Sequence, residues 1–348
     1  MKLGGVLGLH AALLLASAAA AYAVYSYDPN SPDEGPLVLD ASPAQTERLV
    51  YTNKGRVITA SLLADGGFQL EVDEDKILPP VKATPGAPGE PAAPPESAPA
   101  KPERVKSRYR ASDEFGKALE RMLPLHAVQA LGKLSDEQRE KFGLKESLST
   151  LELRAKGQAV SLRVGNQTYG GTSAYLERVG DGEAFLVSSA TLRAVDFRPP
   201  RYMERRLGAQ GMAEVDWLQV DCAGQGRRVL VRAHAGAGQP ERWTPEEDPS
   251  AADELFRNWV EKVFRLSAQE YLAEPPAAPL QGCRLALRAE GKPVGEIELA
   301  WREEAPGKAV HFARSTFTGG WVKLEATGAG QVSADLPAVF GGARPGSP

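Results

Sequence analysis

The stretch LELRAKG at residues 151–157 returns almost unchanged as LALRAEG at residues 285–291. A second stretch, SATLRAV at 189–195, returns as SADLPAV at 333–339, and the two pairs follow the same order along the chain. A single match of this length is unremarkable in a chain of 348 residues, but two in the same order favour an internal duplication. The repeated leucine and alanine positions then mark equivalent core positions in two copies.

The residues around LELRAKG predict a hairpin, a helix and a β meander for the first copy. ERLVYTNKGRVIT at 47–59 predicts a hairpin that turns at Asn53-Lys54-Gly55, and a third strand follows at 67–72. Ser112 is the predicted N-cap of an amphipathic helix, which Pro124 kinks and which continues to Leu131. Glycine turns separate the later elements, which are strands at 148–155, 159–164, 173–179 and 184–188 and a helical turn at 189–197.

The residues around LALRAEG predict the same succession of elements. A hairpin at 217–222 and 228–233 precedes a helix with a capping box from Ser250 to Asp253. Strands at 284–289, 294–301, 309–314 and 321–325 and a terminal turn at 333–340 follow. The predicted fold class is therefore α+β, with two tandem repeated units, each an antiparallel β hairpin, an amphipathic helix, a β meander and a short terminal helix. The predicted units are 45–78 with 103–210, and 213–341, before a flexible tail at 342–348.

Residues 79–102 read PPVKATPGAPGEPAAPPESAPAKP, which is too rich in proline for a helix or a sheet. This composition predicts a disordered insertion in a surface loop, and the alternative is a ligand for a polyproline-binding module. The basic residues that follow, between Lys101 and Arg110, are predicted to form a solvated segment rather than a phosphate site.

Residues 1–27 are predicted to be a membrane anchor or an export signal. The apolar run includes Leu3, Leu9, Leu13, Leu15 and Ala23, and a helix over it would rise roughly 32 Å, about the hydrocarbon thickness of a bilayer. This length favours a single-pass inner-membrane protein with its N-terminus in the cytoplasm and its body in the periplasm. The small-x-small form before and at Ala23 permits the alternative, a soluble periplasmic or secreted protein cleaved near that residue.

Charge and cysteine content limit the partners. The formal net charge of -4 argues against a nucleic-acid surface and against binding to anionic lipid by bulk charge. Cys222 and Cys283 are the only cysteines, and such a pair in an exported protein is a candidate disulfide. The alternative is two buried thiols.

The sequence contains no recognisable catalytic, metal or cofactor motif. His126, His234 and His311 stand alone, without the helical pair or cysteine partners that zinc sites favour. No G-x-S-x-G elbow is present, and the run Asp73-Glu74-Asp75 is typical of a charged loop edge. We therefore predict a protein that is not an enzyme and that needs neither a metal nor a cofactor.

A family resemblance rests on structural glycines, a tyrosine and alternating apolar residues. They are Phe142-Gly143-Leu144, Leu151-Glu152-Leu153, Gly157, Leu162-Arg163-Val164-Gly165, Gly171, Ala174-Tyr175-Leu176 and Ala184-Phe185-Leu186-Val187. The chain resembles, over about 45–210, a bacterial domain family of unknown function whose members have a membrane anchor and duplicated αβ units. The family is encoded beside gliding-motility-type ABC transporters and their auxiliary subunits. Glu146-Ser147 replaces the usual proline, and Phe68 a common tryptophan.

These observations predict a non-enzymatic, membrane-anchored periplasmic interaction module. The resemblance implies that it is accessory to an ABC-type transport or surface-assembly system, with a protein partner in the membrane. The first alternative is a periplasmic small-molecule or glycan-binding protein, with a ligand stacked in a groove between the units on Trp217, Trp243, Trp301 or Trp321. The second is a hydrolase that lacks a sequence signature. The sequence identifies no particular ligand.

Overall fold

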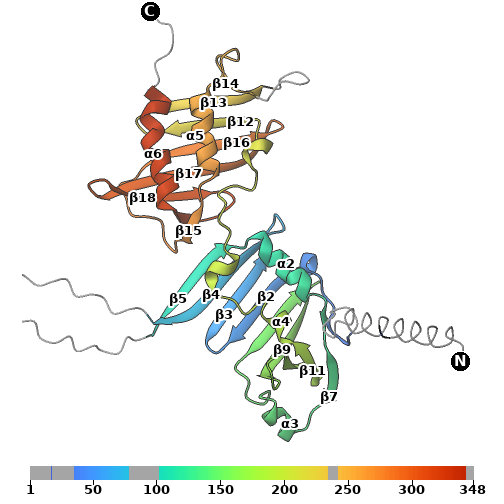
Figure 1. Cartoon of the computed structure of the whole chain (residues 1–348). Helices are drawn as coiled ribbons and strands as arrows, with labels where there is room; N and C mark the ends of the chain where they lie inside the picture. The colour runs from blue at the N-terminus through green and yellow to red at the C-terminus, as the bar shows by residue number, and fades with distance from the viewer. Residues whose placement is uncertain (1–16, 18–34, 78–101, 234–241, 342–348) are drawn as a thin grey trace, which may run out of the picture. The chain divides into compact units, whose positions relative to one another are not determined.

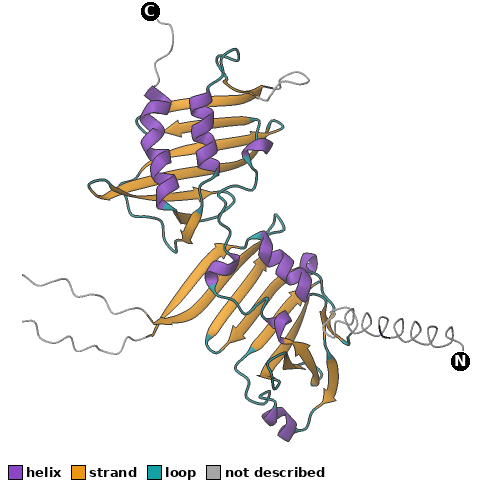
Figure 2. Cartoon of the chain, in the orientation of Figure 1, coloured by secondary structure: helices purple, strands orange, loops and turns teal. Residues whose placement is uncertain are grey.

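The computed structural model of the protein describes Ser17 and residues 35–77, 102–233 and 242–341. Three antiparallel sheets and a few helices in these residues make an α+β fold, as predicted (Figure 1, Figure 2). The chain forms two compact units, Met1–Lys54 with Lys117–Asp196, and Gly55–Gly116 with Phe197–Pro348. The predicted domain boundaries stay predictions, and the predicted insertion up to residue 101 and the tail at 342–348 lie outside the described residues.

The larger sheet has nine strands in the order β5-β4-β3-β2-β8-β9-β10-β11-β7. The Asn53-Lys54-Gly55 turn joins the first two strands of the predicted hairpin, with positive φ at Lys54 and Gly55. The strands are β2 (Thr46–Asn53), β3 (Arg56–Leu62), β4 (Phe68–Ile77), β5 (Pro102–Arg110), β7 (Gln129–Lys133), β8 (Thr150–Ala155), β9 (Gln158–Gln167), β10 (Ser173–Arg178) and β11 (Glu183–Ser188). A separate two-stranded sheet pairs β1 (Leu37–Leu39) with β6 (Leu125–His126).

The other large sheet has eight strands in the order β14-β13-β12-β16-β17-β18-β19-β15. They are β12 (Trp217–Cys222), β13 (Gly226–Ala233), β14 (Arg242–Pro245), β15 (Ala268–Tyr271), β16 (Gln281–Ala289), β17 (Lys292–Ala305), β18 (Lys308–Ser315) and β19 (Trp321–Leu324). Both helices α5 (Glu254–Phe264) and α6 (Ala326–Gly341) lie across one face of this sheet (Figure 1). The core between helices and sheet includes Phe256, Trp259, Val260 and Val263, which lie on one face of α5.

The short helices of the chain are α2 (Asp113–Met122), α3 (Asp136–Lys141), α4 (Ser189–Leu192) and the 3-10 turns η1 (Pro43–Gln45), η2 (Pro199–Tyr202) and η3 (Met212–Glu214). Helix α3 begins with a capping box, in which Ser135 and Gln138 exchange both hydrogen bonds. Phe115 of α2 is fully buried, with ring centroids 5.5 Å from Phe68 and 5.4 Å from Tyr202. This aromatic cluster anchors the start of α2.

Three predicted helix boundaries were wrong. Helix α2 ends at Met122 and does not continue to Leu131, because proline 124 has no N–H to donate and its ring disfavours helix at the residue before it. The cap of α5 is Asp253 and not Ser250, since the Asp253 carboxylate accepts the N–H of Phe256 at 2.9 Å. The predicted short terminal helix of the second half is the 16-residue α6. Its first turn follows Glu325, whose carboxylate accepts the N–H groups of Thr327 and Gly328.

The basic residues after the proline-rich segment belong to an edge strand, on which the side chains of Arg104, Lys106 and Arg108 are exposed. Strand β5 pairs with β4 from Gln69 opposite Arg110 to Ile77 opposite Pro102. Basic side chains of β5 then face acidic ones of β4, with Arg104 2.6 Å from Asp73 and Arg108 3.3 Å from Glu71. Exposed pairs of this kind contribute only about 0–1 kcal/mol each, so they favour the register more than the stability of the hairpin.

Among the described residues, no helix is both long enough and apolar enough to cross a membrane. The predicted anchor, with Leu3, Leu9, Leu13, Leu15 and Ala23, lies outside the residues that the structure describes.

Candidate functional site

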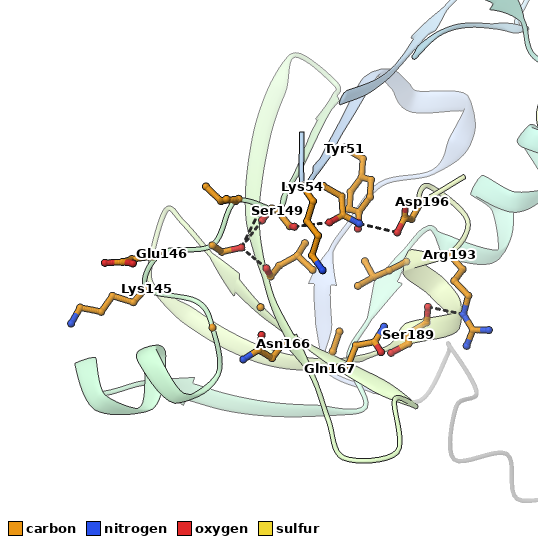
Figure 3. A pocket seen from close by; sticks show the side chains of 18 of the residues that line it. Tyr51, Lys54, Lys145, Glu146, Ser149, Asn166, Gln167, Ser189, Arg193 and Asp196 are labelled. Atoms are coloured by element: carbon orange, nitrogen blue, oxygen red, sulfur yellow. Dashed lines mark hydrogen bonds between the residues drawn. The ribbon is translucent and has the colours of Figure 1, made fainter. Parts of the chain in front are cut away.

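A polar cavity of about 760 Å³ opens in the first unit (Figure 3). Its volume falls within the range of about 300–1,000 Å³ that is common for small-molecule sites. Four segments line it, at residues 51–54, 143–149, 164–167 and 189–196, together with Glu140 of α3 and Ala174 of β10. The four segments are the end of β2, the loop between α3 and β8, the end of β9, and α4 with the turn after it.

Two glycines let the loop after α3 close against β9. Gly143 ends the helix with a φ of 70°, which side chains rarely allow. A Cβ atom on Gly165 would lie 2.4 Å from the carbonyl oxygen of Phe142, and the N–H of Asn166 donates to that oxygen at 2.7 Å. The Phe142 ring also stacks on Tyr175 at 4.1 Å between centroids. The glycines of the family resemblance therefore shape one wall of the cavity.

A chain of hydrogen bonds fixes the polar side chains at the end of β2 and β8. The Ser149 hydroxyl donates to Asn53 Oδ1 at 3.0 Å, and Asn53 Nδ2 donates to Asp196 Oδ2 at 2.9 Å (Figure 3). The N–H of Ser149 donates to the Ser147 hydroxyl at 3.1 Å. Because each group already has a partner, this network holds its geometry without a ligand.

The hydroxyl of Ser189 is different, because it is buried and has no partner. Ser189 is 3% exposed and lines the cavity, and its Oγ makes no hydrogen bond within the described residues. A buried polar group without a partner costs about 1–3 kcal/mol. The hydroxyl is therefore a group that a bound molecule could satisfy.

Replacing Ser189 by alanine is expected to leave the first unit as stable as the wild type or to stabilise it by up to about 1 kcal/mol. The reason is that the substitution removes a desolvated hydroxyl and breaks no hydrogen bond of that hydroxyl. Urea denaturation followed by far-UV circular dichroism measures the change. Ser149→Ala is the matched control and should destabilise, since its hydroxyl donates to Asn53. Destabilisation by Ser189→Ala of more than about 1 kcal/mol contradicts an unpartnered hydroxyl.

The second unit contains a serine–histidine contact. His311 Nε2 lies 2.9 Å from Ser333 Oγ, and the same hydroxyl lies 3.1 Å from the carbonyl oxygen of Gly330. When Ser333 donates its one proton to that carbonyl, His311 Nε2 donates to Ser333. His311 Nδ1 is buried without a hydrogen-bond partner in the described part of the chain, so no carboxylate orients the ring as in a catalytic triad. The contact fits packing better than nucleophilic catalysis.

Burial lowers the pKa of His311 below its ordinary value of about 6.5. Below that pH the unfolded chain takes up a proton that the folded state resists, so stability falls as the pH drops through about 6.5. We expect the wild type to lose more stability than His311→Gln between about pH 7.5 and about pH 5.5. Denaturation curves at both pH values measure this. Ser333→Ala keeps the buried imidazole and should keep the wild-type dependence, and equal slopes for wild type and His311→Gln would contradict the prediction.

The other two histidines considered as metal ligands are His126 and His234. His126 Nδ1 donates to the carbonyl oxygen of Gly35 at 2.9 Å, and His234 lies outside the described residues. Within residues 35–77, 102–233 and 242–341, no group of three histidine, cysteine, aspartate or glutamate side chains is placed to hold a metal ion. Asp73 and Glu74 belong to β4, where Asp73 pairs with Arg104 and Glu74 with Arg56.

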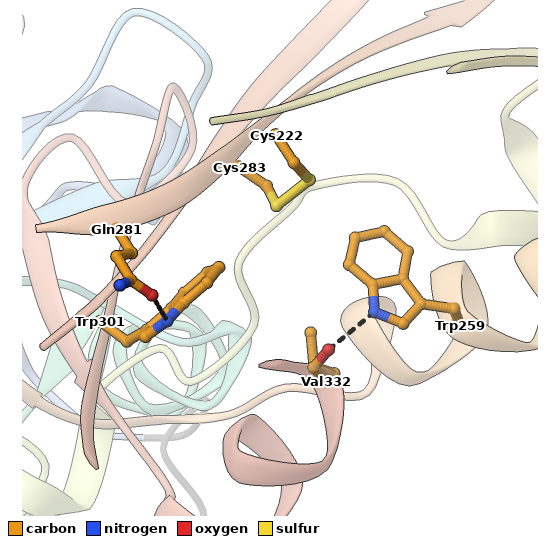
Figure 4. Close-up of a disulfide and its surroundings, with 6 residues drawn as sticks. All are labelled: Cys222, Trp259, Gln281, Cys283, Trp301 and Val332. Atoms are coloured by element: carbon orange, nitrogen blue, oxygen red, sulfur yellow. Dashed lines mark hydrogen bonds between the residues drawn. A yellow bond between two sulfur atoms is a disulfide. The ribbon is translucent and has the colours of Figure 1, made fainter. Parts of the chain in front are cut away.

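Cys222 and Cys283 form a disulfide between the neighbouring strands β12 and β16 (Figure 4). Both residues are almost completely buried in the core between the sheet and its helices. Trp259 lies in the same core and donates its indole N–H to the carbonyl oxygen of Val332 at 2.8 Å. The bridge thus joins the third and fourth strands of the eight-stranded sheet, in the core that this sheet forms with α5 and α6.

The tryptophans proposed to stack on a ligand lie apart. Trp217 is opposite Arg288 of β16, whereas Trp301 donates its indole N–H to Gln281 at the other end of that strand. Seven residues of strand separate those partners, which is roughly 23 Å. Trp243 is buried, and Trp321 lies beneath the guanidinium of Arg314. The tryptophans therefore do not form one stacking platform.

Sequence reasoning missed the cavity, although one signal was present. Leu49, Tyr51 and Asn53 alternate along β2, and Leu153, Leu151 and Ser149 alternate on its partner β8. Each series is apolar at two positions and polar at the third, so a polar pair stands where the alternation predicts core.

Fold and site together define a two-unit antiparallel α+β protein, with a polar cavity in one unit and a disulfide in the core of the other. A family model described as Domain of unknown function (DUF4340) matches residues 94–282, more than half of the chain. The chain therefore belongs to this family, which confirms the resemblance to a family of unknown function over bounds other than those predicted. No curated protein and no solved structure matches the chain.

Proposed function

We propose that the two large sheets descend from one duplicated unit. The strand order β4-β3-β2-β8-β9-β10-β11-β7 of the first has the same connectivity as the order β14-β13-β12-β16-β17-β18-β19-β15 of the second. In both, a helix precedes the edge strand that pairs with the last strand of the meander. Strand β5 is the addition in the first sheet. An experimental structure in which the two sheets fail to superpose strand for strand would overturn the duplication.

The backbone conformation and the strand register around the repeated stretches give further support for the duplication. The LELRAKG and LALRAEG stretches end in turns with nearly equal φ, 51° and 73° at Lys156-Gly157 and 50° and 73° at Glu290-Gly291. Leu151 is opposite Tyr51, and its equivalent Leu285 is opposite Val220. The second pair of stretches does not correspond in this way, because SATLRAV begins at the start of α4 whereas SADLPAV lies within α6.

A charge pair is also retained in reversed form. Arg163 of β9 lies 3.1 Å from Glu177 of β10, and at the equivalent positions Glu298 of β17 faces Arg314 of β18 at 2.5 Å. An opposite-charge cross-strand pair stabilises an antiparallel sheet whichever strand carries the cation. Two copies that diverge while each keeps an opposite-charge pair at this place can swap the acidic and the basic residue between the two strands.

For the protein as a whole, we propose a non-enzymatic interaction module of the periplasm. The N-terminal apolar run would hold it in the inner membrane, or cleavage near Ala23 would release it. Its partner would be a membrane component of an ABC-type transport or surface-assembly system.

The observation that favours docking is Tyr169, a residue that is 107% exposed in the β9–β10 loop. That loop is ordered by the bond from the Gly171 N–H to the Thr168 carbonyl at 2.8 Å. Exposed tyrosines on ordered loops are frequent anchors of protein interfaces.

Affinity purification from solubilised membranes tests this proposal. A tag after Pro348 is used to recover the full chain after mild cross-linking, and the proposal expects membrane components of an ABC-type transporter to be recovered with it. Recovery of the chain alone, at several cross-linker lengths, would count against the docking role.

Tyr169→Ala is expected to weaken recovery of the partner roughly tenfold or more while leaving the free energy of unfolding within about 0.5 kcal/mol of wild type. The side chain has no buried contacts to lose, so only an interface should respond. Quantitative mass spectrometry of the cross-linked eluate measures the effect. Leu255→Ala, at a 52% exposed apolar residue of the second unit, is the matched control. Equal recovery with both variants would show that Tyr169 is not an anchor.

A second proposed function, small-molecule or glycan binding, is favoured by the cavity of the first unit and not by the tryptophans. The observation behind it is the unpartnered Ser189 hydroxyl in the cavity wall. A hydrolase is not favoured by the Ser333 and His311 geometry.

A further inference from the structure

The residues that border the cavity of the first sheet differ from those at the equivalent positions of the second sheet. The shared register makes Asn53 and Ser149 equivalent to Cys222 and Cys283, so a hydrogen-bonded polar pair stands where the disulfide stands. The comparison also extends to helix length, since α4 has 4 residues and the helix in its place, α6, has 16.

Side chains on the neighbouring strands follow the same trend. Ala174 of β10 is opposite Gln167, and at the equivalent position of the second sheet His311 is opposite Trp301. An alanine and a flexible glutamine thus line the cavity where an imidazole and an indole occupy the second sheet. At these positions the first sheet has smaller or more polar side chains and a shorter helix, and they border a cavity of a volume common for small-molecule sites.

The lining indicates the chemistry of that ligand. Three cations, Lys54, Lys145 and Arg193, are matched by three carboxylates, Glu140, Glu146 and Asp196. Because these charges balance, the lining gives no electrostatic preference for either a cationic or an anionic ligand. The carboxamides of Asn166 and Gln167 extend from the end of β9 at the cavity (Figure 3), and no protein partner of either side chain is found in the described residues. Carboxamides and hydroxyls each offer a donor beside an acceptor, which matches the hydroxyl groups of a sugar.

We infer that this cavity binds a neutral, hydroxyl-rich molecule of the size of a mono- or disaccharide. Ser189 Oγ and the carboxamides of Asn166 and Gln167 form its hydrogen bonds, and the apolar side chains of Leu148 and Leu192 contact its C–H faces. This inference rests on the second of the two proposed functions. Its failure would leave the docking proposal untouched, because Tyr169 does not line the cavity.

Ligand-observed saturation-transfer NMR tests the inference on the full chain, purified in a detergent without a sugar headgroup. The probes are glucose, N-acetylglucosamine and maltose, with inorganic phosphate and acetate as charged probes. We expect saturable binding of at least one saccharide and none of the anions. Ser189→Ala should weaken that binding roughly tenfold, since one buried hydrogen bond is lost.

Two tryptophan variants separate cavity from surface. Gln167→Trp gives the first sheet the side chain that Trp301 supplies in the second and should abolish saccharide binding. Gln158→Trp, at the exposed start of the same strand, should bind as the wild type does. The inference is overturned if no saccharide saturates, if only phosphate or acetate saturates, or if Ser189→Ala and Gln167→Trp bind like the wild type. If Gln167→Trp fails to fold, the saccharide binding of Ser189→Ala alone tests the inference.

Discussion

Replacing Cys222 and Cys283 together by alanine is expected to lower the free energy of unfolding of the second unit by about 4 kcal/mol. The bond closes a loop with a sequence separation of 61, and in the chain-entropy model a loop of this length restricts the unfolded chain by about that amount. The two half-cystines are 2% and 3% exposed, so the loss of buried sulfur adds to the effect. A change of this size is a large part of the stability of an ordinary domain.

Urea denaturation followed by tryptophan fluorescence measures this loss selectively. All five tryptophans of the chain belong to the second unit, so the signal reports on that unit. Reduction of the wild type before unfolding should reproduce the shift of the variant. Asn53→Ala/Ser149→Ala, at the equivalent positions of the first sheet, is the matched control and should move the fluorescence transition much less. A shift below about 1 kcal/mol in the cysteine variant would mean that the bond scarcely constrains the unfolded chain.

Alternation and glycine turns were enough to predict most strands of both meanders. Strand β12, of the second predicted hairpin, has the predicted bounds, and the turn at Gly157 lies where the sequence places it. Such strands are half-buried in antiparallel sheets, so buried apolar and exposed polar side chains alternate along each strand and the alternation can be read from the sequence. The proposed duplication rests on the same kind of signal, because the two repeated stretches retain leucine and alanine at matching positions.

Strand β5 could not be predicted in this way. Its residues PERVKSRYR alternate basic and mostly polar side chains, and their pairing depends on acidic residues of β4 that precede the proline-rich segment. Helix α6 was underestimated because its first turn is rich in glycine, which helix propensity disfavours, while the Glu325 carboxylate supplies the cap. For β5 the deciding partner lies outside the local window, whereas for α6 it is the capping residue directly before the helix.

The cavity could not be predicted because no single segment encodes it. Ser189, Asn53 and Gln167 come from three elements, and only Asn53, which interrupts the apolar alternation along β2, stands out in its own sequence context. The Ser189 hydroxyl becomes unusual only when its burial and its lack of a partner are known together. Comparison of the two sheets adds a further signal, since the second has a disulfide where the first has the polar pair Asn53 and Ser149.

Asn53→Cys/Ser149→Cys is expected to form a second disulfide on oxidation and to stabilise the first unit by about 2–3 kcal/mol. A loop with a sequence separation of 96 gives about 4–5 kcal/mol in the chain-entropy model, and the two hydrogen bonds lost at Asn53 offset roughly 1 kcal/mol each. The bond should form because the positions are equivalent to those of Cys222 and Cys283 in the shared register. Peptide mapping under non-reducing conditions identifies the linked peptides, and circular dichroism in urea gives the stability.

Thr52→Cys/Thr150→Cys is the matched control for this variant. Those residues are directly opposite each other, but alternation along an antiparallel pair makes them a hydrogen-bonded pair with a wider Cα separation, which disfavours a disulfide. Free thiols at 53 and 149 after oxidation, or equal cross-linking of the control, would contradict the equivalence of the two sheets. If the bond forms, it joins two side chains of the cavity wall, so saccharide binding should weaken as stability rises. In our proposal, the two copies diverged at this pair in the same way, one copy retaining binding and the other gaining stability.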